Sequence, residues 1–368
     1  MTHPTCPISP SMLTTVQLPT TLALDVSDRS ARFHVVRGDG VQLAAGDMPL
    51  ERERLTELFT SWRGARLVIE VGAHSPWVFR LGEECGMQVV VANPRKVELI
   101  SKSDFKTDKN DAKTLACLGK SDVTLLSPIE PRSKQAQLDL SIQRARKALV
   151  DARTALINHV RGVFKSHGHR SPPCSADCFG ARTTKELPKE LGPALGGVLQ
   201  QIVSLTKEIK TYDQQLATVA KERYPMTKLF APIAGVGVIT ALTFATTIDR
   251  PERFKSARRA GPYIGLVQRK HASGGPGPDL RITKAGDHEM RRLLVMCANY
   301  ILSRHGPDCD LKRFGKRLEA KGGDKRAKKK ARVAVARKLA VLMLHLWQTG
   351  SVYDPFYLAK KRGEPVPA

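Results

Sequence analysis

Two short apolar runs early in the chain each contain one acid near their end. Thr21–Val26 contains Asp25, and Leu67–Val71 contains Glu70. Their apolar and β-branched side chains, and the turn residues around them, predict two buried strands. A carboxylate within a buried strand is costly to desolvate unless a partner compensates its charge. The two acids therefore constrain the fold, because the folded chain must supply positive charge where these strands end.

A second pair of acids, Asp108 and Asp111, stands within Lys106–Lys113. Residues three apart share a helix face, and acids in a first turn suit the helix dipole, so an ordinary helix start would explain this pair alone. If the pair met Asp25 and Glu70, the four charges would repel one another. Carboxylate oxygens are ligands that suit Mg²⁺ or Mn²⁺, and such ions assist phosphodiester chemistry. We therefore predict a metal site of four carboxylates.

The order of elements between Thr20 and Gly119 predicts an α/β domain. Strands are expected over residues 20–26, 31–37, 41–46, 66–71 and 87–92, and helices over Glu51–Trp62, Ser75–Cys85, Pro94–Ser101 and from near Asp108. Three strands close in sequence form an antiparallel meander, and the later strands alternate with helices. This is the order of the ribonuclease-H-like fold, in which the first and fourth strands are central neighbours. Asp25 and Glu70 would then be adjacent, with the helix from Asp108 closing over them.

The charge of the chain is large and unevenly placed. The 368 residues include 60 Lys and Arg against 35 Asp and Glu, a formal net charge of +25. Residues 1–125 hold 15 basic and 15 acidic residues, so the whole excess lies in residues 126–368. This excess is larger than solubility requires and is typical of proteins that bind a polyanion such as nucleic acid.

The N-terminus and the cysteines bear on the compartment. No apolar run is long enough to span a membrane, and residues 1–18, without Lys or Arg, do not resemble a signal peptide; we expect a disordered leader and a cytoplasmic protein. The seven cysteines are scattered, which favours reduced thiols. One cluster has the short spacing of zinc ligands: His167, His169, Cys174 and Cys178. No second cysteine pair follows it, so a connecting loop is favoured over a zinc site.

The rest of the chain predicts a mainly helical structure. Two long periodic stretches, Gln135–Val163 and Leu195–Val219, flank a loop over residues 167–180. The second stretch is close to a heptad repeat, which favours a coiled-coil hairpin or a dimer arm; ordinary packing is the alternative. We expect five parts: the leader 1–18, a metal-dependent α/β domain 19–125, a helical or coiled-coil region 126–227, a compact, mainly helical unit 228–305 and a basic helical tail 306–368.

The C-terminal half carries glycine-rich turns and a basic run that suit contact with phosphate. Gly235–Gly237 precedes an apolar helix and resembles a helix-hairpin-helix turn, whose N–H groups can bind phosphate, although simple turns use the same residues. A polar loop over Gln268–Gly275 contains Ser273, which from spacing alone is a plain loop residue. Leu311–Lys338 holds 13 basic and two acidic residues; in this chain phosphate contact is favoured over a solvated arm.

With these residues assembled, the chain resembles the DEDD-type transposases of insertion sequences, which join a RuvC-like N-terminal domain to a C-terminal transposase domain. The N-terminal motifs are Leu24-Asp25-Val26, Ile69-Glu70, Val91-Ala92-Asn93-Pro94, Lys106–Ala112 and Leu115-Ala116. The C-terminal motifs are Gly235-Val236-Gly237, Tyr263-Ile264-Gly265-Leu266, Ser273-Gly274-Gly275 and Ile282–Gly286. The resemblance runs from Thr20 to about Ile301. The usual Thr-Gly after the second acid is replaced by Gly72–Ser75, a departure that concerns the substrate side of this loop.

The resemblance implies a DNA recombinase and gives Ser273 a role. In this family the serine before glycine in that loop is the nucleophile, and Ala272 stands where a second serine is common, so Ser273 is the candidate in the loop. The resemblance also implies cleavage and rejoining through a phosphoserine link, with Mg²⁺ or Mn²⁺ at the four acids. It further implies a structured guide RNA that pairs with target and donor DNA, and a homo-oligomer, either dimer or tetramer.

Two other functions stay open at this point. A Holliday-junction-resolving nuclease would use the four acids and water, with Ser273 merely structural; it would leave free 5′-phosphate ends and no covalent adduct. A non-catalytic regulator would keep the fold and bind nucleic acid, and it would show no metal-dependent cleavage. The four acids favour an enzyme over the regulator.

Overall fold

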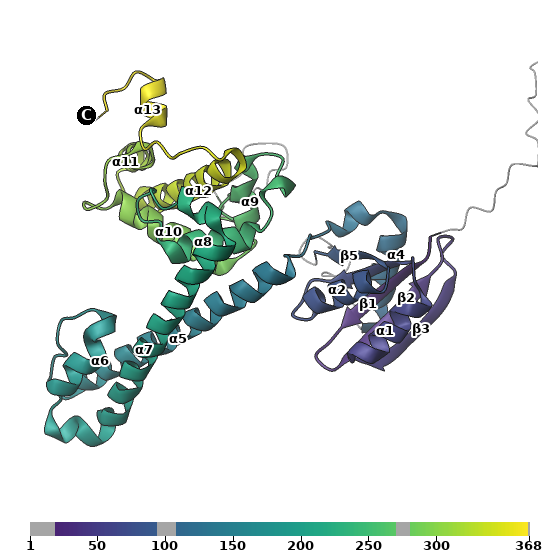
Figure 1. Cartoon of the computed structure of the whole chain (residues 1–368), viewed down its shortest axis with the longest axis horizontal. Helices are drawn as coiled ribbons and strands as arrows, with labels where there is room; N and C mark the ends of the chain where they lie inside the picture. The colour runs from purple at the N-terminus through teal and green to yellow at the C-terminus, as the bar shows by residue number, and fades with distance from the viewer. Residues whose placement is uncertain (1–18, 94–107, 270–279, 367–368) are drawn as a thin grey trace, which may run out of the picture. The chain divides into compact units, whose positions relative to one another are not determined.

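The computed structural model describes residues 19–93, 108–269 and 280–366. The chain divides into two compact units, Met1–Pro131 and Arg132–Ala368, which are drawn in Figure 1. Each unit has hydrophobic clusters of its own. The finer division of the second unit at residues 228 and 306 stays a prediction.

The first unit is built on a five-stranded sheet with the order β3-β2-β1-β4-β5. The strands are β1 (Thr21–Val26), β2 (Ser30–Val36), β3 (Gln42–Pro49), β4 (Arg66–Glu70) and β5 (Gln88–Ala92). The first three strands are antiparallel neighbours, whereas β1, β4 and β5 run parallel. The α/β prediction is confirmed, and the placement of the first strand beside the fourth is consistent with a ribonuclease-H-like fold.

Helices cover both faces of this sheet (Figure 1). Helices α1 (Arg52–Ser61) and α2 (Ser75–Glu84) pack on one face, and α4 (Asp108–Ser121) with the short turn η2 (Val123–Leu126) packs on the other. Side chains alternate along a strand, so Leu24 of β1 packs under α1 and α2 while Ala23 packs under α4. The helix expected over Pro94–Ser101 lies outside the described residues.

The second unit begins with a long antiparallel pair of helices, α5 (Lys134–Ser166) and α7 (Gly192–Arg223). Three polar contacts, seven residues apart along α5, cross between them: Asp139 with Arg223, Arg146 with Asp213 and Arg153 with Thr206. This spacing agrees with the heptad pattern in the sequence. The two helices thus form a hairpin arm, and a role of that arm in dimerisation stays a prediction.

The loop predicted over residues 167–180 is wrong in its second part, where α6 (Ala176–Lys185) begins after Ser175. Phe179 on α6 is fully buried in a cluster with Ile157 of α5 and Leu199 of α7. Local Gly and Pro content favoured a loop, but burial of this aromatic ring near the end of the arm stabilises a helix.

The remaining helices form a second body. They are α8 (Val238–Ile248), α9 (Ala260–Ile264), α10 (His288–Leu302), α11 (Asp310–Gly322), α12 (Lys325–Thr349) and α13 (Tyr357–Lys361), with 3-10 turns at Pro225–Leu229, Pro251–Arg253 and Ala257–Arg259. A further 3-10 turn, Lys189–Leu191, belongs to the arm and precedes α7. Helix α12 places Ala331, Val335 and Leu339 in the core at four-residue steps, while basic side chains occupy its other faces. Across the described part of the chain, no helix combines the length and apolarity that crossing a bilayer requires.

Candidate active site

Asp25 and Glu70 occupy equivalent positions on the two central parallel strands. The register pairs Leu24 with Ile69, and Asp25 and Glu70 are the next residues along each strand. Because Ala23 packs under α4 and side chains alternate, both carboxylates lie on the face that α4 covers. Neighbouring strands are about 4.8 Å apart, so the sheet brings these two half-buried acids together.

Helix α4 brings Asp111 to the same end of the strands. Near its other end Gly119 packs beside Thr21, since a Cβ on Gly119 would lie 3.3 Å from the Thr21 methyl group. Asp111 is roughly 12 Å before Gly119 along the helix, and Asp25 is roughly 13 Å beyond Thr21 along β1. The first turns of α4 therefore lie over the carboxyl ends of the central strands. Asp111 is only 8% exposed there, one turn before the buried Leu115.

The fourth predicted acid, Asp108, begins α4, and its side chain lies outside the described residues. Within the described part of the chain, no group of three or more His, Cys, Asp or Glu side chains is close enough together to hold a metal ion. The donors do fit a hard divalent cation by type, because Asp25, Glu70 and Asp111 offer carboxylate oxygens alone. These three acids, with Asp108, are the residues that could hold such an ion.

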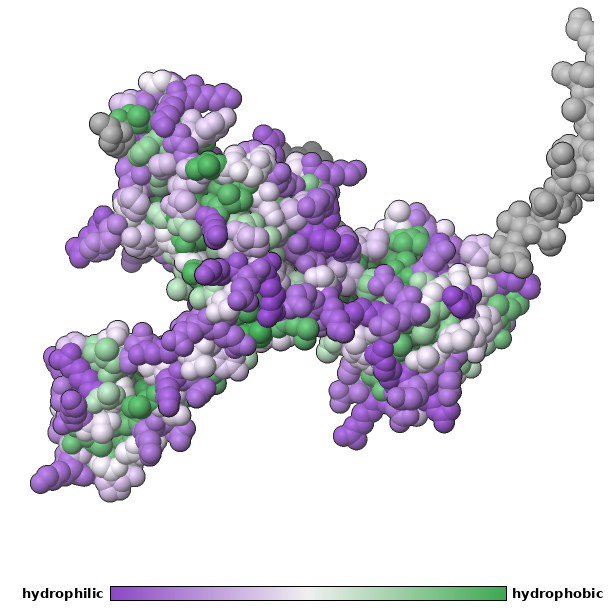
Figure 2. All heavy atoms as spheres, in the orientation of Figure 1, coloured by the Kyte–Doolittle hydropathy of each residue, from purple (hydrophilic) through white to green (hydrophobic). Residues whose placement is uncertain are grey.

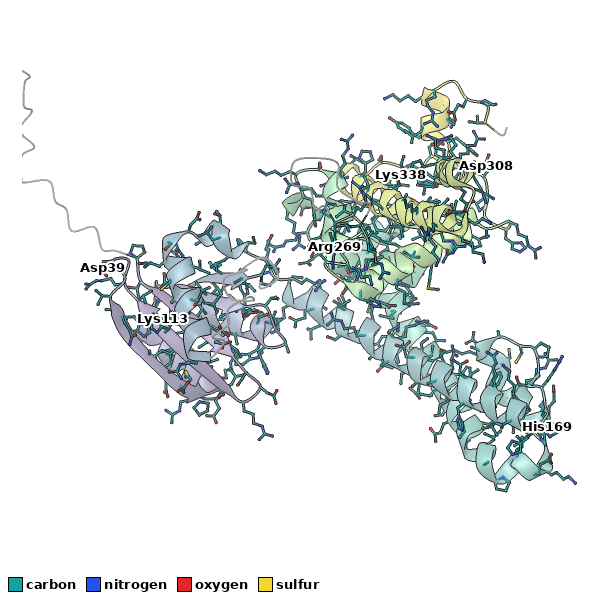
Figure 3. The ribbon with its side chains drawn as sticks, turned by 180° about the vertical axis from the view of Figure 1, so that it is seen from behind. Asp39, Lys113, His169, Arg269, Asp308 and Lys338 are labelled. Atoms are coloured by element: carbon teal, nitrogen blue, oxygen red, sulfur yellow. The ribbon has the colours of Figure 1, made fainter. Side chains whose placement is uncertain are left out.

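Strand β2 adds two basic side chains that the sequence analysis did not single out. Arg32 is the cross-strand partner of Asp25, and its guanidinium donates to both carboxylate oxygens of Asp47 at 2.8 and 3.0 Å. Burial, together with the cations Lys113 and Arg32, lowers the pKa of His34 below 6.5, so its imidazole is neutral at neutral pH. Lys113 belongs to α4 and lies over the sheet (Figure 3). The tight turn between β1 and β2 fixes this register and would have predicted the placement of Arg32.

The loop after Glu70 forms a closed turn where the sequence departs from the resembled family. The Ser75 hydroxyl donates to the Gly72 carbonyl at 3.0 Å and accepts from the Gly72 N–H at 3.2 Å. The Trp77 indole donates to Nδ1 of His74 at 3.1 Å. Hydrogen bonds made by residues Gly72–Ser75 therefore fix the backbone conformation of the segment that follows Glu70.

Ser273 lies outside the described residues, but both ends of its loop are described. The chain leaves the described part at Arg269, labelled in Figure 3, and re-enters it at Leu280. Three backbone contacts close the stem: Gln268 bridges Ile282, the Arg269 N–H donates to the Arg281 carbonyl at 3.0 Å, and the Thr283 N–H donates to the Val267 carbonyl at 2.8 Å. The loop that carries Ser273 thus starts from a two-stranded antiparallel stem.

Glycines allow the two segments at the foot of this stem to cross in contact. Gly265 has φ +76°, and a Cβ on it would lie 2.2 Å from the Ala285 carbonyl oxygen. Gly286 has φ +72°, and a Cβ on it would lie 2.1 Å from the Tyr263 carbonyl oxygen. Both positions need glycine because of the backbone angle and the lack of space. The motifs Tyr263–Leu266 and Ile282–Gly286 therefore supply the glycines that let these two backbone segments pass in direct contact.

A buried arginine fastens the same crossing. Arg291 on α10 is 8% exposed, and its guanidinium donates to the carbonyls of Ile264 at 2.7 Å and Ala285 at 2.8 Å. Burying a cation is costly unless its donors are satisfied, and here they join the two segments that lead to the Ser273 loop. The sequence analysis did not single out Arg291.

The His and Cys cluster of the arm offers no metal site within the described residues. His169 bonds to Glu190 through Nε2 at 3.0 Å. The Cys174 thiol is directed to the Pro172 carbonyl at 3.6 Å, and Cys178 is exposed on α6. The preference for a connecting region over a zinc site stays a prediction.

Known protein families match both units of the chain. Residues 22–168 match the sequence model of the DEDD transposases of IS110 elements, described as "Transposase". Residues 227–313 match the model described as "Transposase IS116/IS110/IS902 family". The chain belongs to the DEDD-type transposases of insertion sequences.

Curated relatives agree with this assignment. The chain is 27% identical over 288 residues to the "Transposase for insertion sequence element IS1328" of Yersinia enterocolitica, covering 77% of this chain and 84% of the relative. It is 27% identical over 268 residues to the "Transposase for insertion sequence element IS1111A" of Coxiella burnetii, covering 70% and 71%. It is 28% identical over 347 residues to the "Putative transposase y4pF/y4sB" of Sinorhizobium fredii, covering 90% and 85%. Membership in this family implies an enzyme of recombination that binds DNA.

Proposed function

We propose that this transposase cleaves and rejoins DNA with Ser273 as its nucleophile and with Asp25, Glu70, Asp108 and Asp111 as ligands of a divalent cation. One observation supports the carboxylate set above all others. Asp25 and Glu70 stand side by side at the ends of parallel strands, on the face over which α4 buries Asp111. Carboxylates that face the same edge of the sheet repel one another, and a divalent cation held by them would relieve that repulsion.

The residues divide the chemistry between them. Asp25, Glu70, Asp108 and Asp111 would hold a divalent cation, which when bound would neutralise charge on a phosphate oxygen. The Ser273 hydroxyl loses its proton and attacks phosphorus, so that a bond from serine oxygen to phosphorus forms as the bond to one DNA oxygen breaks. The departing DNA oxygen gains a proton and leaves as a hydroxyl group. Rejoining is the reverse attack by a DNA hydroxyl on the phosphoserine, which releases the serine.

A structured guide RNA, a homo-oligomeric assembly and a cytoplasmic location complete the proposal. The excess of basic residues lies in residues 126–368, where phosphate contacts with a folded RNA would need it. Sequencing of RNA that co-purifies with the protein tests the guide. A single structured species supports it, whereas random fragments would indicate binding by charge alone.

The carboxylate assignment is tested with Asp25→Asn and Glu70→Gln, each compared with Glu53→Gln. Glu53 is exposed on α1, which packs on the sheet face opposite α4, so its variant matches the loss of charge away from the carboxylates. We expect the first two variants to lose DNA cleavage in Mg²⁺ by about 100-fold or more while binding DNA within about twofold of wild type. Equal cleavage by Asp25→Asn and wild type would sink the assignment.

The nucleophile is tested with Ser273→Ala. The wild-type protein should form a covalent adduct with labelled DNA that survives a denaturing gel, and the variant should form none. An adduct that persists in the variant would point to another nucleophile. Wild-type protein that releases free 5′-phosphate ends without any adduct would instead indicate the water-dependent nuclease.

A further inference from the structure

A groove of about 1120 Å³ runs along one face of α12 in the second unit. Its floor is apolar and includes Leu266, Ile282, Phe314, Val333 and Leu342. Figure 2 shows hydrophobic surface over these C-terminal helices, bordered by hydrophilic side chains. The stem of the Ser273 loop lines it, as do α11 and the segment before α13. The space exceeds that of one small ligand, so it suits several linked units of a chain.

The rim of the groove is strongly basic. Seven Lys and Arg are among the described residues that line it, including Arg258, Arg281 and Lys329, against two acids. Both acids are occupied by the protein itself. Asp310 accepts from the N–H groups of Leu358 at 2.6 Å and Ala359 at 3.1 Å, whereas Asp354 forms an ion pair with Lys360 at 2.9 Å. The net charge of the rim therefore favours a polyanion.

Aromatic rings lie between these cations. Phe314, Tyr353 and Tyr357 line the groove, and Tyr357 is 61% exposed. The ammonium group of Lys338 lies 4.1 Å from the centre of the Phe314 ring (Lys338 is labelled in Figure 3). Burial and the neighbouring guanidinium groups of Arg317 and Arg362 lower the pKa of Lys338. Positive charge is thus crowded at this edge, and a phosphate would relieve the crowding.

An unpaired strand presents the chemistry that matches such a groove. Its bases expose π faces that stack on aromatic side chains, and its phosphates pair with cations. A duplex keeps its bases stacked inside and offers only phosphates to a surface of this kind. An apolar floor with aromatic rings between cations therefore favours an unpaired strand over a duplex.

We propose that this groove binds an unpaired stretch of DNA, with bases on the floor of α12 and phosphates on its rim. This assignment rests on the proposed function, because the stem of the Ser273 loop contributes Gln268, Arg281 and Ile282 to the lining. A strand held there is the strand on which that loop would act. The groove thus keeps a melted strand beside the residues that lead to the nucleophile.

Binding of labelled oligo(dT) to the full-length protein tests the proposal, by fluorescence anisotropy at one salt concentration. Tyr357→Ala removes an exposed ring, and Lys329→Glu reverses one rim charge. Lys328→Glu is the matched control, because Lys328 belongs to the same basic run and does not line the groove. We expect Tyr357→Ala and Lys329→Glu to weaken oligo(dT) binding about tenfold, with Lys328→Glu close to wild type.

A duplex of matched length and an oligo(rU) of equal length complete the experiment. Tyr357→Ala should leave duplex binding within about twofold of wild type. Undiminished oligo(dT) binding by this variant, or an equal loss on the duplex, would overturn the proposal, and a larger loss on oligo(rU) would assign the groove to RNA instead. The assay involves no cleavage and is done in the Ser273→Ala background. A failed adduct experiment would therefore overturn the assignment of Ser273 as nucleophile without affecting the proposal for the groove.

Discussion

Arg291 shows how one side chain can set the geometry of a loop to which it does not belong. Its guanidinium reaches carbonyls of two segments that cross at the foot of the Ser273 stem. A guanidinium is a planar fork with several donors, whereas an ammonium group is a single point of charge. Lysine at this position would keep the charge without joining the two segments in the same way. We therefore regard Arg291 as a positioning residue.

We expect Arg291→Lys to reduce kcat for DNA cleavage about tenfold while KM changes little, because the substrate surface is intact and the loop is misplaced. Arg292→Lys is the control, since the neighbouring Arg292 pairs with Glu289 at the surface. Cleavage kinetics and thermal unfolding are measured together. If Arg291→Lys lowers only the unfolding temperature and kcat of the folded protein is unchanged, the residue is structural alone.

At the scale of residues, the positions of the carboxylates could be predicted from the sequence and the contacts of Arg291 could not, for a physical reason. The positions of Asp25, Glu70 and Asp111 follow from periodicities that are local to each element, two in a strand and 3.6 in a helix. The contacts of Arg291 depend on where two loops cross, which no local period encodes. The position of Arg32 is intermediate in predictability, because the tight turn between β1 and β2 sets the register of that one strand pair.

Among the elements, α4 depends on a close approach to the sheet at Gly119. A Cβ on Gly119 would lie 2.5 Å from a methyl group of Val68, so a larger residue must displace the helix. We expect Gly119→Ala to destabilise the first unit by about 1–3 kcal/mol and to reduce cleavage, because Asp111 moves with α4. The free energy of unfolding from urea titration and the cleavage rate check this.

Gly162→Ala on α5 is the matched substitution, because nothing lies within 4 Å of a Cβ there. It should stabilise α5 by about 0.5–1 kcal/mol, as alanine does within a helix. Equal stability of Gly119→Ala and wild type would show that α4 tolerates a wider spacing from the sheet than the packing indicates.

The elements themselves were predictable where the pattern of burial is simple. The strands and long helices of both units lie close to the ranges that periodicity predicts. Strand β3 continues to Pro49, beyond the predicted range, because it pairs with β2 as far as Ser30. The end of β3 is therefore set by its pairing with β2 and not by its own sequence pattern. Helix α6 escaped prediction because Phe179 is buried by α5 and α7, which are distant in sequence.

The molecule as a whole has separate cores in its two units, and its unfolding should show this. We expect Leu24→Ala to lower only the transition of the first unit, and Leu339→Ala only that of the second, each by about 2–5 kcal/mol, since both side chains are fully buried. The three tryptophans make the units distinguishable, because Trp62 and Trp77 lie in the first and Trp347 in the second.

Fluorescence-detected unfolding in guanidinium, with Trp347→Phe as a background, follows the first unit by itself. In that background Leu24→Ala should shift the midpoint and Leu339→Ala should not. A single transition that both substitutions shift equally would mean that the two units unfold as one cooperative body.

The arm of α5 and α7 has a fixed helix alignment and therefore a fixed length. Asp139 is completely buried, and Arg223, Tyr224 and Gln135 hold its carboxylate; sliding the helices by one turn would strand that charge at a cost of about 3–5 kcal/mol. One alignment is therefore permitted. The 33 residues of α5 measure roughly 50 Å, about one and a half turns of a B-form duplex. A partner bound at the α6 end of the arm would therefore lie at a fixed distance from the start of α5.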